Sequence, residues 1–227
     1  MPDCYPILGF DDIAPIAERD NGEPLRSLED YCVGIERLLI EPGATPRADA
    51  EMFARTGVAT RLRAVQTEVM ASFGAAARLV VTYAFRHPDD QQRFHNAALD
   101  RARARAPDAD PDALMRRANQ EAASPSVAGH PTGGAVDVTI RRSNGELLDT
   151  GHSIADFSRP AFVPTISSAI TAEQQANRLT LRRLMVAQHF APFHGEWWHF
   201  SYGDKEWAAF YGEPHALYGP IYPNAAR

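Results

Sequence analysis

Residues 129–140, GHPTGGAVDVTI, join a glycine-rich loop to a strand and place His130 seven residues before Asp137. The loop, residues 124–134, holds two prolines and three glycines, so it cannot continue a helix or strand. A loop that precedes a strand can fold back on it, and Gly133 and Gly134 permit a tight backbone path. His130 and Asp137 could therefore meet at one point, although a turn histidine and a strand aspartate with unrelated roles would fit the same spacing.

A second stretch, HGEWWHFSYGD at residues 194–204, places Glu196 three residues before His199. Residues three apart in a regular strand point to opposite faces. Glu196 must therefore lie in the preceding turn, or at a bulge, if both groups are to face one cavity. Taken alone, the stretch is also compatible with an aromatic core strand that carries a solvated glutamate.

Together the two stretches offer two imidazoles and one carboxylate as metal ligands, with a further carboxylate beside them. A catalytic zinc site usually has three protein ligands and an open position for water, and a nearby carboxylate can take a proton from that water. We therefore predict one zinc ion per chain, held by His130, His199 and one of the two carboxylates, Asp137 or Glu196, with the other carboxylate beside it as a base.

The rest of the chain predicts an α+β fold, a small and mainly antiparallel sheet flanked by helices, because strands mix with helices without strict βαβ alternation. Hydrophobic residues make up 44% of the 227 residues, enough for one core. We expect a single domain over 1–227, with an irregular N-terminal wrap at 1–50 and a catalytic core at 51–210. The expected helices span 48–73, 89–106, 111–122 and 171–190, and the expected strands span 79–85, 135–140 and 197–202, with a hairpin turn at 143–146.

The composition excludes some classes of partner. The formal net charge is −6 and the pI is about 5.7, which argues against a nucleic-acid or anionic-membrane surface. The basic cluster Arg101, Arg103 and Arg105 alternates with alanine and is expected at a solvated helix end. No apolar run approaches the ~18 residues of a membrane span, and the two cysteines, Cys4 and Cys32, form no zinc or disulfide pattern. We expect a cytoplasmic protein without nucleic-acid or membrane partners, in which neither cysteine is catalytic.

Arg86 is a third candidate for the site. It follows an apolar strand in YAFRHP, and the chain turns at Pro88. A guanidinium at a strand end beside a cleft can polarise a carbonyl and hold the oxyanion that forms on attack. A surface arginine paired with Asp89 or Asp90 is the alternative.

These motifs resemble those of the zinc D-alanyl-D-alanine dipeptidases of the vancomycin-resistance type, within a larger family of zinc D-Ala-D-Ala peptidases that shares a hedgehog-like fold. The similarity lies in HPTGGAVD at 130–137, EWWH at 196–199 and FRHP at 85–88. NRLTLRRLM at 177–185 and LLDTGHSIADF at 147–157 are weaker matches. The first two motifs are specific in combination, and the others support them.

The resemblance implies roles for individual residues. It implies zinc ligation by His130, Asp137 and His199, and proton transfer by Glu196. It also implies stabilisation of the tetrahedral intermediate by Arg86. We expect Trp197 and Trp198 to wall and dry the site.

The chain departs from the family pattern at the substrate. Family members carry a serine two residues before the first zinc histidine, and here that position is Ala128. Ser126 and Ser124 are the candidates to supply the hydroxyl instead. His87 is inserted in the arginine motif, and Thr150 replaces a methionine.

The leading hypothesis is hydrolysis of a small dipeptide, D-Ala-D-Ala or a close relative. Three alternatives stay open: a carboxypeptidase of the same family that trims peptidoglycan stem peptides, a specialised peptidase or amidase of small-molecule metabolism with an altered substrate, and a non-catalytic zinc-binding module. Retention of Glu196 and Arg86 counts against the last, since pure binding needs neither.

Overall fold

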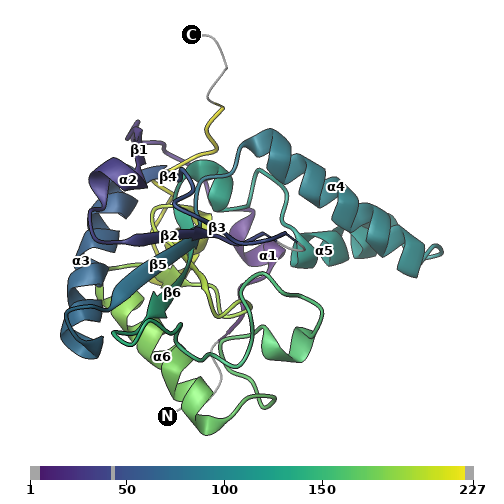
Figure 1. The fold of residues 1–227 in the computed structure, drawn as a ribbon. Helices are drawn as coiled ribbons and strands as arrows, with labels where there is room; N and C mark the ends of the chain where they lie inside the picture. The colour runs from purple at the N-terminus through teal and green to yellow at the C-terminus, as the bar shows by residue number, and fades with distance from the viewer. Residues whose placement is uncertain (1–5, 42–43, 223–227) are drawn as a thin grey trace.

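The computed structural model, which describes residues 6–41 and 44–222, is organised around a six-stranded sheet (Figure 1). The strands, in sheet order, are β3 (Arg47–Ala48), β2 (Glu36–Leu39), β5 (Arg78–Tyr83), β6 (Ala135–Arg141), β8 (His199–Ser201) and β7 (Ala191–Pro192). Only the β2–β5 pair is parallel, and the other four pairs are antiparallel. A separate antiparallel pair joins β1 (Leu25–Ser27) to β4 (Phe53–Arg55).

Helices surround the sheet. They are α1 (Phe10–Ile13), α2 (Leu28–Tyr31), α3 (Thr56–Phe73), α4 (Pro88–Arg105), α5 (Pro111–Glu121), α6 (Ala172–Ala187) and α7 (Lys205–Tyr211), with short 3₁₀ turns η1 (His130–Thr132) and η2 (Pro160–Phe162). Figure 1 shows α4 and α5 projecting as a pair from the side of the sheet away from α3. The predicted α+β class with a mainly antiparallel sheet is confirmed.

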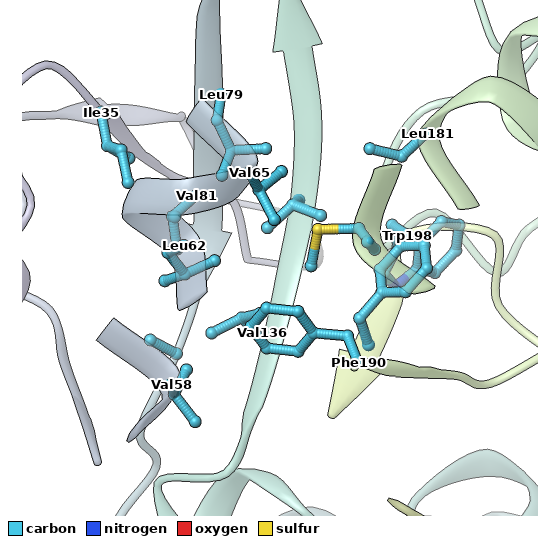
Figure 2. Packing of buried hydrophobic residues seen from close by; sticks show 14 of the residues in the cluster. Ile35, Val58, Leu62, Val65, Leu79, Val81, Val136, Leu181, Phe190 and Trp198 are labelled. Carbon is cyan, nitrogen blue, oxygen red and sulfur yellow. The ribbon is translucent and has the colours of Figure 1, made fainter. Parts of the chain in front are cut away.

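The core lies between the sheet and helices α3 and α6. Val58, Leu62, Val65 and Val69 recur every three to four residues on α3, so they share one helix face, and all are fully buried. Figure 2 shows Leu62 and Val65 meeting side chains of β5 and β6, with Leu181 of α6 across the same cluster. Strand β6 is buried along nearly its whole length, which fixes it as the central strand on which the site is built.

The N-terminal region contains more regular structure than the irregular wrap expected at 1–50. It supplies α1, β1, α2, β2 and β3, and β2 joins the main sheet beside β5. The helix expected from residue 48 begins only at Thr56, because Phe53–Arg55 pairs with β1 instead. Gly57 does not divide this helix. A Cβ at Gly57 would lie 2.5 Å from Tyr218 Oη, so the glycine allows the C-terminal segment to pack closely on the first turn.

Local sequence also sets the bounds of α6, of the turn at 143–146 and of two strands. Thr171 caps α6, with a capping box in which Thr171 and Gln174 bond each other's backbone N–H groups. The predicted turn at 143–146 is present, with Gly145 at φ +87°. Strand β5 ends at Tyr83 rather than at residue 85. Strand β8 spans only His199–Ser201, because Trp197 and Trp198 before it lie in a turn.

Arg178 of α6 ties the long loop after β6 to the core. It is fully buried, and its guanidinium donates hydrogen bonds to the carbonyls of Thr150, Phe162 and Pro164. The same guanidinium lies 5.5 Å from the centre of the Trp197 ring. Burial lowers the pKa of Arg178 to about 10, so the carbonyl dipoles and the ring are what hold the cation in place.

We expect Arg178→Ala to lower the free energy of unfolding by about 3–5 kcal/mol, because three buried carbonyls would lose a charged donor. Urea denaturation of the purified variants measures this. Arg183→Ala, an exposed neighbour on the same helix, is the matched control and should change the free energy by less than about 0.5 kcal/mol. Equal stability of Arg178→Ala and the wild type would show that the loop is held elsewhere.

Candidate metal centre and active site

The pairing register of β5, β6 and β8 brings Tyr83, Asp137 and His199 together. Tyr83 on β5 pairs with Asp137 on β6, and Asp137 pairs with His199 on β8. Directly opposed residues on neighbouring strands lie on the same face of a sheet with Cβ atoms about 4.5–5.5 Å apart. A bulge after Val81 shifts the β5–β6 register and so aligns Tyr83 with Asp137. The Nδ1 atom of His199 is 2.9 Å from Asp137 Oδ1.

His130 reaches this point from the 3₁₀ turn η1, just before β6. Gly133 ends the turn at φ +72°, a left-handed conformation that glycine adopts without strain, and the chain then enters the strand. The Nδ1 atom of His130 lies 2.8 Å from the carbonyl of Ala84. Since a carbonyl only accepts, Nδ1 carries the proton and Nε2 keeps its lone pair. That Nε2 lies 3.5 Å from Asp137 Oδ1.

His130, Asp137 and His199 form one buried cluster with the chemistry of a metal site. Each offers a ligand atom, and these atoms all lie within 4.8 Å of one another. Burial opposes charge on Asp137, but the two imidazoles hold its pKa well below the usual range. Burial likewise disfavours a charged His199, yet the hydrogen bond and negative charge of Asp137 raise its pKa to about 10. The donor set itself, two imidazole nitrogens and one carboxylate oxygen around one point, suits zinc.

Glu196 lies in the turn before β8, as the three-residue spacing to His199 requires. The backbone N–H of His199 donates to the Glu196 carbonyl at 3.1 Å, which closes the turn. Glu196 lines the same cavity as the three cluster residues. Burial raises the pKa of Glu196 to about 7, partly offset by the positive charge of His199. A carboxyl group with a pKa near neutrality is suited to both taking and giving a proton.

Arg86 lies beyond the end of β5 and lines this cavity. Its Nε donates to Tyr83 Oη at 3.1 Å and its Nη1 to Gln91 Oε1 at 2.8 Å. The guanidinium carbon is 4.4 Å from the ring centre of Tyr83 and 4.8 Å from that of Phe94, so the arginine is sandwiched between the two. The alternative of a surface arginine paired with a nearby aspartate is wrong.

Those aspartates have other partners. Asp90 pairs with Arg93, and Asp89 lies 3.4 Å from Nδ1 of His87. The His87 side chain caps α4 by accepting from the Asp89 N–H.

Two buried carboxyl groups of the site were not anticipated. Glu206, in the first turn of α7, lines the cavity and has Oε2 at 3.9 Å from His199 Nε2. Burial raises the pKa of Glu206 to about 8. Asp204 caps α7 by accepting from the Trp207 N–H and also accepts from Ser201. In the sequence, only Asp204 was recognisable, as a candidate helix cap. Nothing in the sequence indicated the direction of α7, which decides where Glu206 lies.

Only some of the residues expected to contact substrate line the cavity. Trp198 lines the cavity and belongs to the core cluster. Trp197 is buried under Arg178 and is not among the cavity-lining residues, so it supports the site from behind. Ser126 is exposed, is not among the lining residues either, and its hydroxyl pairs with that of Ser124. Ala128 does line the cavity, without a hydroxyl.

The cavity has a volume of about 740 Å³. The metal-ligand cluster, Glu196 and Arg86 form one part of its lining, and helices α1, α4 and α5 with the loop after β6 provide much of the rest.

No helix in the described part of the chain is long and apolar enough to cross a membrane. Cys32 is buried, and burial raises the pKa of its thiol to about 11, whereas Cys4 lies outside the described residues. Arg103 and Arg105 at the end of α4 are exposed, as expected. Arg101 is also exposed, but it pairs with Glu121, and both residues line the cavity.

Two buried imidazoles and a carboxylate, beside a second carboxylate and a guanidinium, are typical of a metal-dependent hydrolase. A family model described as D-Ala-D-Ala dipeptidase matches residues 47–218, most of the chain. The chain therefore belongs to this peptidase family, which confirms the resemblance seen in the motifs.

Individual relatives and solved structures are also similar to parts of the chain. A D-alanyl-D-alanine dipeptidase of Synechocystis sp. is 32% identical over 107 residues, covering 40% of this chain and 43% of that protein. One of Escherichia coli is 34% identical over 74 residues, covering 32% and 36%. The chain thus matches less than half the length of these relatives.

Among solved structures, a mutant of the vancomycin-resistance D,D-pentapeptidase VanY in complex with Zn(II) has a TM-score of 0.42 at 15% identity, covering 91% of this chain and 97% of that chain. The LD-carboxypeptidase LdcB has a TM-score of 0.42 at 18% identity, covering 89% and 81%.

Replacement of a ligand should remove the metal. We expect zinc-loaded wild-type protein to contain about one equivalent of zinc by mass spectrometry, and His130→Ala to lose most of it, because two ligands in place of three leave the site open. His215→Ala, a histidine outside the cluster, is the control and should keep the zinc. Full zinc content in His130→Ala would disprove the ligand assignment.

Glu206 should strengthen metal binding without being a ligand. A carboxylate behind a ligating imidazole makes the ring a better donor, and its loss commonly weakens metal binding 10- to 100-fold. We expect Glu206→Gln to raise the Kd for zinc by roughly that factor in a competition titration with a chelating dye. The exposed Glu213→Gln should leave the Kd unchanged. Equal affinities of Glu206→Gln and the wild type would mean that Glu206 has no such effect.

Proposed function

We propose that this chain hydrolyses the peptide bond of a small D,D-dipeptide of the D-alanyl-D-alanine type, with one zinc ion per chain. One observation carries the proposal: His130, Asp137 and His199 converge in a buried cluster within the same cavity as Glu196 and Arg86. Zinc at that cluster would supply Lewis acidity, lowering the pKa of a bound water and polarising the carbonyl of the scissile bond.

Glu196 is the proton carrier of this proposal. Its carboxylate takes a proton from the attacking water and then delivers it to the leaving amine. Both transfers need a group whose pKa lies near the working pH, and burial moves the Glu196 pKa in that direction. The turn that Glu196 closes with His199 keeps the carboxylate next to the ligand cluster.

Arg86 stabilises the negative charge that develops on the carbonyl oxygen. Its guanidinium is already oriented by Tyr83, Gln91 and Phe94, so little reorganisation is needed as the charge forms. Gln91 is anchored in turn, because its Nε2 donates to the carbonyl of Ala123.

The substrate class is proposed from the family. The presence of both Glu196 and Arg86 in the cavity argues against a non-catalytic binding module. A peptidase with an altered substrate is the second candidate, because Ala128 offers no hydroxyl and Ser126 is not among the residues that line the cavity.

Turnover should depend on Glu196 while metal binding does not. We expect zinc-loaded wild-type protein to release free amino acids from D,D-dipeptides such as D-Ala-D-Ala, and Glu196→Gln to reduce kcat by several orders of magnitude while it keeps about one zinc. The isosteric amide cannot accept the proton, but it leaves the ligands in place. Amino-acid release and zinc content are measured on the same preparations.

Loss of zinc from Glu196→Gln would make Glu196 a ligand and refute the proposed division of roles. No release of amino acid from any D,D-dipeptide by the zinc-loaded wild type would refute the proposed reaction.

Arg86 should act mainly on the transition state. We expect Arg86→Ala to lower kcat by roughly 10²–10³-fold, as for removal of an oxyanion-stabilising donor. Arg86→Lys should recover little, because an ammonium lacks the planar fork that bonds Tyr83 and Gln91. Arg93→Ala, exposed on α4, is the control. A raised KM at unchanged kcat would instead give Arg86 a role in binding the ground state.

A further inference from the structure

The cavity that contains the ligand cluster is larger than D-Ala-D-Ala requires. Its volume of about 740 Å³ falls within the range of roughly 300–1,000 Å³ that encloses a drug-sized ligand. D-Ala-D-Ala carries only two methyl side chains. Much of the cavity would therefore stay filled with water if that dipeptide were bound.

The surplus volume is bounded by apolar side chains from segments far apart in the sequence. Leu8, Phe10 and Ile13 come from α1 and the residues before it, and α1 lies beside α5 (Figure 1). Ile154 and Phe157 come from the loop after β6 that Arg178 holds in place. Phe193, from the turn before β8, lines the same cavity. Apolar residues form the larger part of this lining, while Arg101, Asn119, Glu121 and Asp156 add polar groups to it. An apolar group gains by displacing water from the apolar part.

Two aromatic residues in this lining are unusually exposed. Phe94 on α4 is 42% exposed and Phe157 is 41% exposed, and both line the cavity. Each is held by a residue of the site: Phe94 lies against the Arg86 guanidinium, and Phe157 makes an edge-to-face contact with Trp198 at 5.7 Å between ring centres. Exposed aromatic side chains that lead into an apolar cavity are typical of a ligand-binding surface.

We infer that the cavity is a subsite for a bulky apolar side chain, and that the substrate is a D,D-dipeptide with at least one large aliphatic or aromatic residue. The inference rests on the proposed function and names its substrate class. It also accounts for Ala128, because a site that gains affinity from apolar contact depends less on one hydroxyl. Apolar pockets discriminate by about 10- to 200-fold per methylene group, so the preference over D-Ala-D-Ala should be large.

The test measures binding in the inactive Glu196→Gln protein loaded with zinc. Isothermal titration gives the Kd for D-Ala-D-Ala, D-Ala-D-Leu, D-Leu-D-Ala, D-Ala-D-Phe and D-Phe-D-Ala. We expect at least one bulky dipeptide to bind tenfold or more tightly than D-Ala-D-Ala. If D-Ala-D-Ala binds as tightly as or more tightly than all four, or if no dipeptide binds, the inference is wrong.

Variants locate the subsite. In the same Glu196→Gln background, Phe157→Ala and Phe10→Ala should each reduce the ratio of affinities between the best bulky dipeptide and D-Ala-D-Ala by about tenfold. Met70→Ala is the matched control, because Met70 is 39% exposed on α3 and is not among the cavity-lining residues. An unchanged ratio in both phenylalanine variants would place the preference elsewhere and overturn the inference.

Hydrolysis by the wild type, measured as kcat/KM for the same five dipeptides, separates this inference from the proposed function. Binding of bulky dipeptides without hydrolysis of any peptide would contradict the proposed reaction and leave the subsite supported. Hydrolysis with D-Ala-D-Ala as the best substrate would support the reaction and contradict the subsite.

Discussion

The pairing of Asp137 with His199 across β6 and β8 is the constraint on which the site depends. A shift of one residue in this register would turn one of the two side chains to the opposite face of the sheet. The register is held by the buried apolar residues of β6, which leave the strand one way to lie between its neighbours. The core that stabilises the fold therefore also sets the geometry of the ligand cluster.

Charge balance is the second requirement. Asp137, Asp204 and Glu206 are buried and Glu196 is half-buried around two imidazoles, and burial of so many carboxyl groups is costly unless they are neutral or face a cation. Hydrogen bonds from Ser201 and the first turn of α7 satisfy part of Asp204. The other carboxyl groups fit a site that binds a cation and transfers a proton. A purely structural core would gain no stability from them.

The sequence predicted which residues converge in the cavity better than it predicted their surroundings. His130, Asp137, Glu196 and His199 lie in two short motifs whose spacing already implied a loop, a strand and a turn, and local backbone geometry delivers all three. The prediction that Glu196 lies in the preceding turn or at a bulge followed from strand periodicity and from the condition that Glu196 and His199 face one cavity.

What the sequence could not predict depends on contacts between distant segments. Strand β2 is only four residues long and half-buried throughout, so it has no periodic signal, and its parallel pairing with β5 is a tertiary event. Glu206 lines the cavity because of the way α7 packs against β7 and α1, which are distant from it or joined to it only through the tertiary fold. Ser126 was chosen for its hydroxyl and its position near His130, but the turn that brings His130 to the cluster leaves Ser126 exposed.

A crystal structure of the zinc-loaded protein, with anomalous diffraction recorded at the zinc edge, tests the central claim most directly. The account predicts a single strong anomalous peak bonded to His130 Nε2, His199 Nδ1 and a carboxylate oxygen of Asp137, with Glu196 beside the metal but not bonded to it. A peak at any other set of residues, or one that has Glu196 as a ligand in place of Asp137, would contradict it.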